Sequence, residues 1–151
     1  MDAEQLKKLS DILHSESKAE VVKLVQSISS EDELFVLLDN YNWDNGFEVP
    51  EAIINHPNCT LSLALLAFYR ADGLRYLFEG EDAFANPLSK SWETFIKEVY
   101  DKILKEQYQN GSISYQPEIT NIQKFKLKKL HPNLSSFILD GISEKDLHIL
   151  L

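Results

Sequence analysis

A nearly uniform apolar stretch in the middle of the chain, residues 61–71, constrains the fold more than any other feature. It reads LSLALLAFYRA, and a helix with this sequence is apolar on nearly every face until Arg70. Such a helix must be covered by other elements on most of its sides. The chain is therefore expected to fold around this helix.

Three further helices are predicted within the first 40 residues. Asp2, Ser17 and Ser30 each stand three positions before a Gln or Glu, which is a helix-capping pattern. Apolar residues at three- and four-residue steps follow each signal and predict helices over residues 3–14, from 18, and from 31 to about 39. Because the turns between them are short, these helices should pack as antiparallel neighbours.

Residues 40–60 combine a turn with a short helix. Asn45 and Gly46 tolerate positive φ, and Asp44 is expected to bond the following backbone amides as an Asx turn. Pro50 suits the first turn of a short helix, which must end before Pro57. The buried helix that follows is expected to begin at an N-cap, Thr60, and to stop at Asp72-Gly73.

The second half of the chain predicts a long helix and then a mixed segment. Asn86 and Pro87 open a helix that should run to about Gln109. Residues 124–128 alternate lysine with apolar residues, which favours a half-buried or edge strand, and a helix over 118–130 is the open alternative. Ser143 is expected to cap a final short helix, and the apolar C-terminus should dock on its own core or on another subunit.

Together these patterns predict a mainly α fold. It should be an orthogonal or antiparallel helical bundle with helix-pair packing, with room for a short strand or an extended C-terminal segment. A chain of 151 residues falls in the size range of one domain. Within it we expect N-terminal helices (1–40), a central motif (43–79), a long helix (87–109) and a capping segment (111–151).

The charge of the chain is strongly negative and unevenly distributed. Fifteen Lys and Arg against 24 Asp and Glu give −9, and no Lys or Arg occurs between Lys23 and Arg70. Such a field repels nucleic acid and anionic lipid and attracts basic protein surfaces, although acidity also serves plain solubility. We expect a protein partner, basic in character, and neither nucleic acid nor membrane. The acids in this interval are Glu31, Asp32, Glu33, Asp39, Asp44, Glu48 and Glu51.

Cysteine content and the N-terminal sequence bear on the compartment. The start MDAEQLKKLSDILH lacks the apolar region of a secretory signal, and no apolar run is long enough to cross a bilayer. A single cysteine, Cys59, fits a reducing compartment. A cytoplasmic location is therefore expected.

The central segment NWDNGFEVPEAIINHPNCTLSLALLAFYRADG, over about residues 40–80, resembles a bacterial domain-of-unknown-function family numbered 4274. The shared pattern is a Trp-Asp-x-Gly turn, a short helix from the proline, a connector with Cys, an Ala-Leu-rich helix and a closing Ala-Asp-Gly. The chain departs from it at residues 60–62, which affects helix capping more than fold. The resemblance implies a fold unit and no reaction. The segment is also similar to the helix pairs of α-solenoids, but no second copy occurs at a fixed period.

Several residues of this segment could carry chemistry. His56 and Cys59 are zinc-type ligands, but a structural site needs four, and no metal or cofactor is predicted. They could also act as base and nucleophile, because the N-terminus of the next helix would lower the pKa of the thiol. The competing interpretation is that Cys59 packs as a small hydrophobe while His56 caps the preceding helix. Asp44, Glu48 and Asp72 are the best carboxylate set, but they lack the spacing of a calcium loop.

We therefore expect a protein-binding module, with an immunity-type inhibitor of a basic effector as the specific case. Its partner-binding residues would be Glu31, Asp32, Asp39, Glu48 and Trp43. The alternative is a small hydrolase or metal-dependent enzyme using Asp44, His56, Cys59 and Asp72. A further hypothesis is self-association through the apolar C-terminal residues Leu147, Ile149, Leu150 and Leu151.

Overall fold

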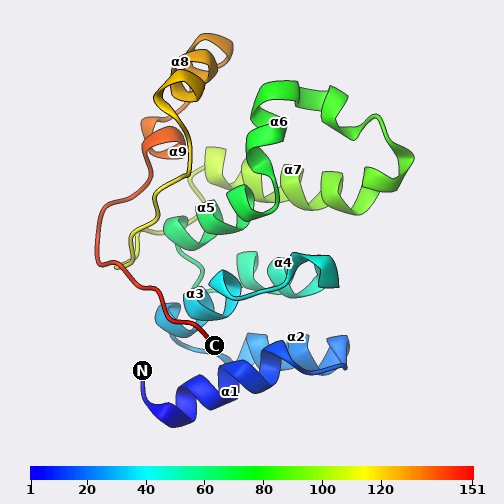
Figure 1. Ribbon diagram of the computed structural model, residues 1–151, viewed down its shortest axis with the longest axis vertical. Helices are drawn as coiled ribbons and strands as arrows, with labels where there is room; N and C mark the ends of the chain where they lie inside the picture. The colour runs from blue at the N-terminus through cyan, green and yellow to red at the C-terminus, as the bar shows by residue number, and fades with distance from the viewer.

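The computed structural model describes the whole chain, residues 1–151, and confirms the mainly α fold (Figure 1). Short 3-10 turns at Trp43–Asn45, Gly80–Phe84 and Pro87–Ser89 join some of the helices, and residues outside helices pair only at isolated bridges. No helix has the length and apolar character that spanning a membrane requires. In chain order the helices are α1 Ala3–Leu13, α2 Lys18–Ser27, α3 Glu31–Asp39, α4 Glu48–Ile54, α5 Leu61–Arg70, α6 Gly73–Glu79, α7 Lys90–Leu104, α8 Asn121–Leu130 and α9 Ser136–Asp140.

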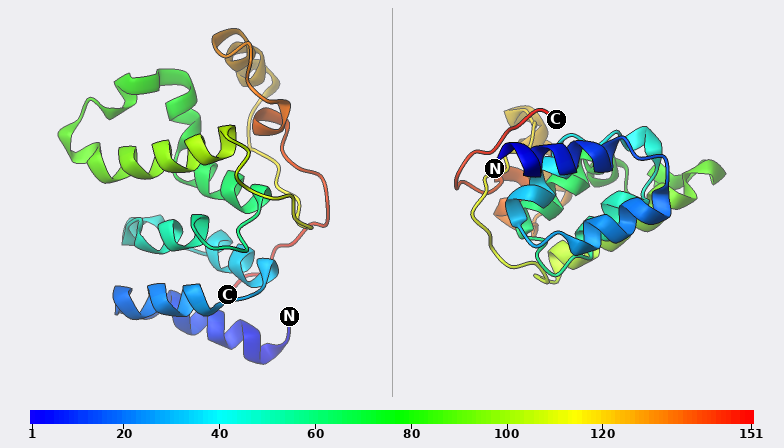
Figure 2. Two further views of the ribbon diagram at one scale, coloured as in Figure 1. Left: turned by 180° about the vertical axis from the view of Figure 1, so that it is seen from behind. Right: turned by 90° about the horizontal axis from the view of Figure 1, so that it is seen from below.

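The helices stack in layers along the long axis of the molecule. The α1/α2 pair forms one end, the α3/α4 pair lies on it, and α5 and α7 follow (Figures 1 and 2). Within the stack α2 packs on α4, α1 on α3, α3 on α5, and α5 on α7. This arrangement confirms the helix-pair packing that the short turns predict.

Side-chain caps fix the starts of the first three helices as predicted. Asp2 accepts a hydrogen bond from the Gln5 amide while the Gln5 side chain accepts one from the Asp2 amide, which is a complete capping box. Ser17 and Ser30 cap α2 and α3 by accepting from the amide three residues on. Local sequence thus sets the register of the first 40 residues.

The predicted central helix, α5, is buried on nearly all sides. Leu63, Leu65 and Phe68 have no exposed surface, and they belong to one hydrophobic cluster of 31 buried residues. Asp72 adopts a left-handed φ of 66°, and the chain turns there from α5 into α6. A Cβ at Gly73 would overlap the Phe68 ring, so glycine allows the start of α6 to approach α5 closely.

Three predictions for the second half of the chain are wrong in detail. The long helix ends at Leu104 and not near Gln109, and Glu106 takes a left-handed φ of 54° just after it. Residues 124–128 are part of α8, so the helix left open over 118–130 forms and the edge strand does not, because Thr120 and Gln123 form a capping box and no neighbouring strand is present to pair with. The expected helix from Ser143 does not form.

Residues 141–151 instead form an extended segment, here called the C-terminal strap. It runs down one side of the stack and ends beside α3, drawn in red in Figure 1. Bridges join it to the segment after α7, at Ile113–Lys145 and Tyr115–Ile142, and its end exchanges hydrogen bonds with the Asn40 side chain. Of its apolar residues, Leu147, Ile149 and Leu151 pack on the chain's own core, whereas Leu150 is exposed.

Candidate functional site

His56 and Cys59 lie in the connector between α4 and α5, where both are buried. His56 Nδ1 accepts a hydrogen bond from the Asn58 amide at 3.0 Å, and the Asn58 side chain donates to the Ser29 carbonyl at 2.8 Å. The imidazole therefore stabilises the turn of the connector. The Asn58 side chain ties this turn to the segment before α3.

The environment of Cys59 keeps its thiol protonated. Burial raises the pKa of Cys59 to about 12, with Lys102 opposing the rise and Glu31 adding to it. The lowered pKa expected from the N-terminus of α5 is therefore wrong, because desolvation of the sulfur outweighs the helix dipole. At neutral pH the residue offers no thiolate for attack on a substrate.

Asp44 and Asp72 lie in separate turns, and both are exposed. The Asx turn predicted for Asp44 forms two residues earlier in the chain, at Asn42, whose side-chain oxygen accepts a hydrogen bond from the Asp44 amide at 3.0 Å. His56 and Cys59 share a hollow beside α7, and neither aspartate lines it. Nowhere in the chain do three His, Cys, Asp or Glu side chains gather closely enough to hold a metal ion.

The acids at the start of α3 are bonded to the second half of the chain. Glu31 Oε1 accepts hydrogen bonds from the amide and the hydroxyl of Ser112, each at 3.0 Å. Asp32 forms an ion pair with Lys145 of the strap at 3.3 Å. Both carboxylates also lie in the first turn of α3, where the helix dipole favours negative charge. Glu31 and Asp32 therefore have internal partners.

Asp39, at the other end of α3, has a largely buried side chain. Its side chain is only 7% exposed and contacts Arg70 at 2.6 Å and His148 Nδ1 at 2.9 Å. Arg70 also donates to the Asp39 carbonyl at 3.0 Å. The carboxylate thus connects α3 to the end of α5 and to the strap, and little of it faces solvent.

Trp43 belongs to an aromatic cluster that holds the turn before α4 against α7. Its ring centroid lies 5.6 Å from that of Tyr41, 5.9 Å from that of Phe95 and 6.3 Å from that of Phe47. The indole is half-buried, and its Nε1 is fully buried without a hydrogen-bond partner. The polar tip of Trp43 therefore does not reach solvent.

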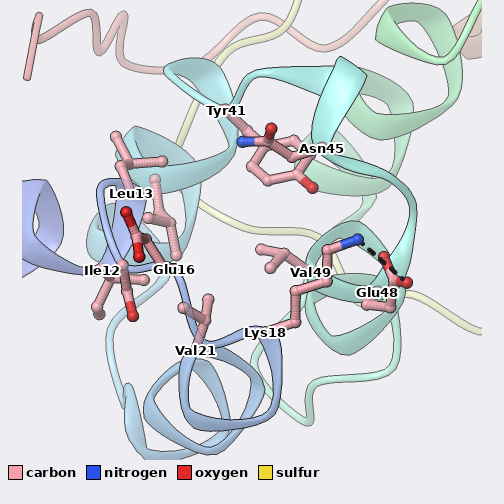
Figure 3. Close-up of a pocket in the computed structure, with 11 residues that line it drawn as sticks. Ile12, Leu13, Glu16, Lys18, Val21, Tyr41, Asn45, Glu48 and Val49 are labelled. Atoms are coloured by element: carbon pink, nitrogen blue, oxygen red, sulfur yellow. Dashed lines mark ion pairs between the residues drawn. The ribbon is translucent and has the colours of Figure 1, made fainter.

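A hollow of about 320 Å³ opens between α1, α2, α3 and α4. Figure 3 shows the side chains of α1 and the turn after it on one side and those of α4 on the other. Lys18 of α2 and Glu48 of α4 form an ion pair across the mouth at 3.6 Å, and both side chains are more than half exposed (Figure 3). The apolar part of the lining consists of Ile12, Leu13, Val21, Leu37, Tyr41 and Val49.

The Tyr41 ring lies in the apolar lining of this hollow, and its hydroxyl is neutral. Its hydroxyl donates to the Gly46 carbonyl at 2.8 Å, and burial raises the pKa of Tyr41 to about 12, with Glu48 adding to the rise. Gly46 has a φ of 99°, so the predicted turn is confirmed at the glycine. The turn thereby positions Asn45 and Glu48 at the edge of the hollow.

A second hollow adjoins the first on the other side of Glu48, between α2 and α4. It includes Glu51. Burial raises the pKa of Glu51, and the nearby carboxylates of Glu98 and Glu48 raise it further, while Lys102 lowers it. Local negative charge at this edge is therefore incompletely neutralised.

We call the exposed acids around the two hollows the acidic rim. Only Glu48 among them has an ion-pair partner, and that pair is exposed and weak. The sequence predicts Glu48 as a partner-binding residue. It does not predict the hollow or the place of Glu16 beside it, because the hollow forms only where α1, α2 and α4 come into contact. The turn signal at residues 14–17 was the available clue that Glu16 is exposed. The acidic rim consists of Glu16, Glu48 and Glu51.

Fold and site together define a layered helical domain with an acid-rimmed apolar hollow and a buried central connector. The model of the family described as Domain of unknown function (DUF4274) matches residues 29–104, half of the chain. The chain belongs to this family, as the resemblance of its central segment indicates. The match spans α3 to α7, the elements around the buried helix α5. No curated protein and no solved structure matches the chain.

Proposed function

We propose that the protein is a protein-binding module whose acidic rim and apolar hollow receive a basic partner. The observation that carries this proposal is the division of the acids of the N-terminal half into internally bonded and exposed ones. Glu31, Asp32 and Asp39 are bonded to Ser112, Lys145, Arg70 and His148 within the chain, whereas the rim acids face solvent around the apolar-lined hollow.

The chemistry of such a partner follows from the hollow. An apolar side chain can occupy the space between Ile12 and Val49, while Lys or Arg residues beside it pair with Glu16 and Glu48. Desolvated apolar anchors with charged surroundings are the usual source of affinity in protein interfaces. Immunity-type inhibition of a basic effector is one function that this surface would serve.

The experiment compares two variants of equal net charge. The rim variant carries Glu16→Gln, Glu48→Gln and Glu51→Gln, and the control carries Glu106→Gln, Glu118→Gln and Glu144→Gln. The control acids are exposed and form no ion pair. After cross-linking in cells, a basic protein captured by the wild type is purified and titrated against each variant.

The proposal predicts that the rim variant loses at least about tenfold in affinity and that the control binds like the wild type. Raising the salt concentration should weaken wild-type binding, because exposed charges are screened beyond about 10 Å at 0.1 M salt. Equal affinities for the two variants would refute the role of the rim. A captured partner that is acidic, bound independently of salt, would refute it as well.

A further inference from the structure

The helix α8 presents an unusual surface at the end of the molecule remote from α1 and α2 (Figures 1 and 2). Only Leu127 of this helix is buried, whereas Ile122 and Phe125 are 69% and 60% exposed. The His131 ring anchors the end of the helix to the Leu77 carbonyl at 2.7 Å. An apolar stripe on α8 therefore faces away from the core.

Positive charge surrounds this stripe. Residues 121–131 contain four lysines and no acid, in a chain whose net charge is −9. Lys124 is paired with Asp140 at 3.3 Å, but Lys126, Lys128 and Lys129 are exposed and form no ion pair. Lys129 Nζ lies 4.5 Å from the centre of the Phe125 ring, so charge and aromatic surface are presented together.

The other end of the same molecule carries the complementary surface. The hollow in Figure 3 is apolar within and bordered by Glu16 and by the exposed Lys18–Glu48 ion pair, in which an incoming lysine can replace Lys18. A protein cavity of roughly 150 Å³ is enough to bind benzene, and this hollow measures about 320 Å³. A phenylalanine ring flanked by lysines matches it in size, polarity and charge.

We propose that α8 of one copy docks into the acid-rimmed hollow of a second copy, with Phe125 as the apolar anchor. α8 and the hollow lie at opposite ends of the stack, so they cannot meet within one chain (Figure 2). The contact is heterologous, head to tail, and therefore repeats from copy to copy. Because it uses the acidic rim, this self-association rests on the proposed function and competes with a basic partner for the same surface.

The test uses the whole protein and sedimentation velocity over a range of concentrations. One variant, Lys126→Glu with Lys128→Glu and Lys129→Glu, leaves α8 with three acids and one lysine and so makes it acidic, and the other, Glu16→Lys with Glu48→Lys, makes the rim basic. Each variant alone should be monomeric, because its α8 and its rim then carry like charge. A mixture of the two should associate again, because acidic helices meet basic rims.

Two further variants complete the set. Phe125→Ala should weaken association at least about tenfold without affecting folding, since the ring is largely exposed. Lys8→Glu with Lys23→Glu and Lys90→Glu changes the net charge by as much as the α8 variant does, at exposed, unpaired lysines, and should associate like the wild type. Wild-type association should decline between about 0.02 M and 0.3 M salt as screening increases.

A wild type that stays monomeric at low salt, or a mixture that fails to associate, would overturn the self-association. Binding of α8 to anionic lipid vesicles without self-association would overturn it too and would assign the helix to membranes. The proposed function fails separately, when the rim variant keeps its affinity for a basic partner. The two failures are therefore distinguishable.

Discussion

Replacing Asp39 by alanine tests whether the acids of α3 serve the fold. The change removes a carboxylate that is only 7% exposed and that binds Arg70 at 2.6 Å and His148 at 2.9 Å. A hydrogen bond to a charged group contributes about 1.5 to 3 kcal/mol net, and an exposed ion pair contributes below about 1 kcal/mol. Because Arg70 is partly solvated and His148 is exposed, we expect Asp39→Ala to lower the free energy of unfolding by about 2 kcal/mol.

Urea denaturation monitored by circular dichroism measures this loss of stability. In thermal denaturation the Tm should fall by roughly 4 to 8 °C. Asp32→Ala is the matched control on the same helix, since its partner Lys145 is exposed, and with the helix-dipole contribution included it should cost less than about 1 kcal/mol. Hydrogen exchange of the strap amides should accelerate in Asp39→Ala. An Asp39→Ala variant as stable as Asp32→Ala would refute the internal role of Asp39.

Three other outcomes follow from the structure. Gly111→Ala places a Cβ against the Glu31 carboxylate and should lower the free energy of unfolding, measured by urea denaturation, by about 1 to 3 kcal/mol. The double variant Gly111→Ala with Glu31→Ala should lose less stability than the sum of the two single variants, and an additive loss would contradict the overlap. Because burial raises the pKa of Cys59 to about 12, iodoacetamide at pH 8 should label it only after unfolding, and labelling of the native protein at the rate of the unfolded chain would contradict its burial. Burial raises the pKa values of Cys59, Tyr41 and Tyr115 to about 12, so above pH 9 the unfolded chain loses protons that the folded chain keeps. The free energy of unfolding should therefore fall from pH 8 to pH 10.5, and an unchanged value would contradict this linkage.

The N-terminal half of the fold could be predicted because its determinants are local. Asp2, Ser17 and Ser30 each fix a helix start through a hydrogen bond three residues along the chain. The burial of α5 could be predicted from its composition alone. Helix caps and apolar periodicity depend on residues a few positions apart, so they can be recognised in the sequence.

The C-terminal half could not be predicted equally well, because distant contacts decide it. The alternation of Lys and apolar residues in residues 124–128 is compatible with a strand or a helix, and a strand needs a neighbour that this chain does not provide. The strap is extended because it bonds to residues near 113 and 40, which no local pattern reveals.

The candidate site could be predicted only in part, because distant contacts also decide which acids are exposed. The absence of cations between Lys23 and Arg70 marks an acidic region, but not which acids are free. Glu31 accepts a hydrogen bond from Ser112, and Asp32 and Asp39 pair with Lys145 and His148, each across some 80 to 110 residues of sequence. Such pairings appear only when the chain is folded.

Hydrogen exchange of the protein with and without a bound basic partner tests the central claim most directly. Partner binding should slow exchange in residues 12–21 and 41–52, which surround the hollow and carry the acidic rim. Exchange at the start of α3, residues 31–34, and in the strap should not change. Protection confined to the strap and α3, or to the connector around Cys59, would contradict the account.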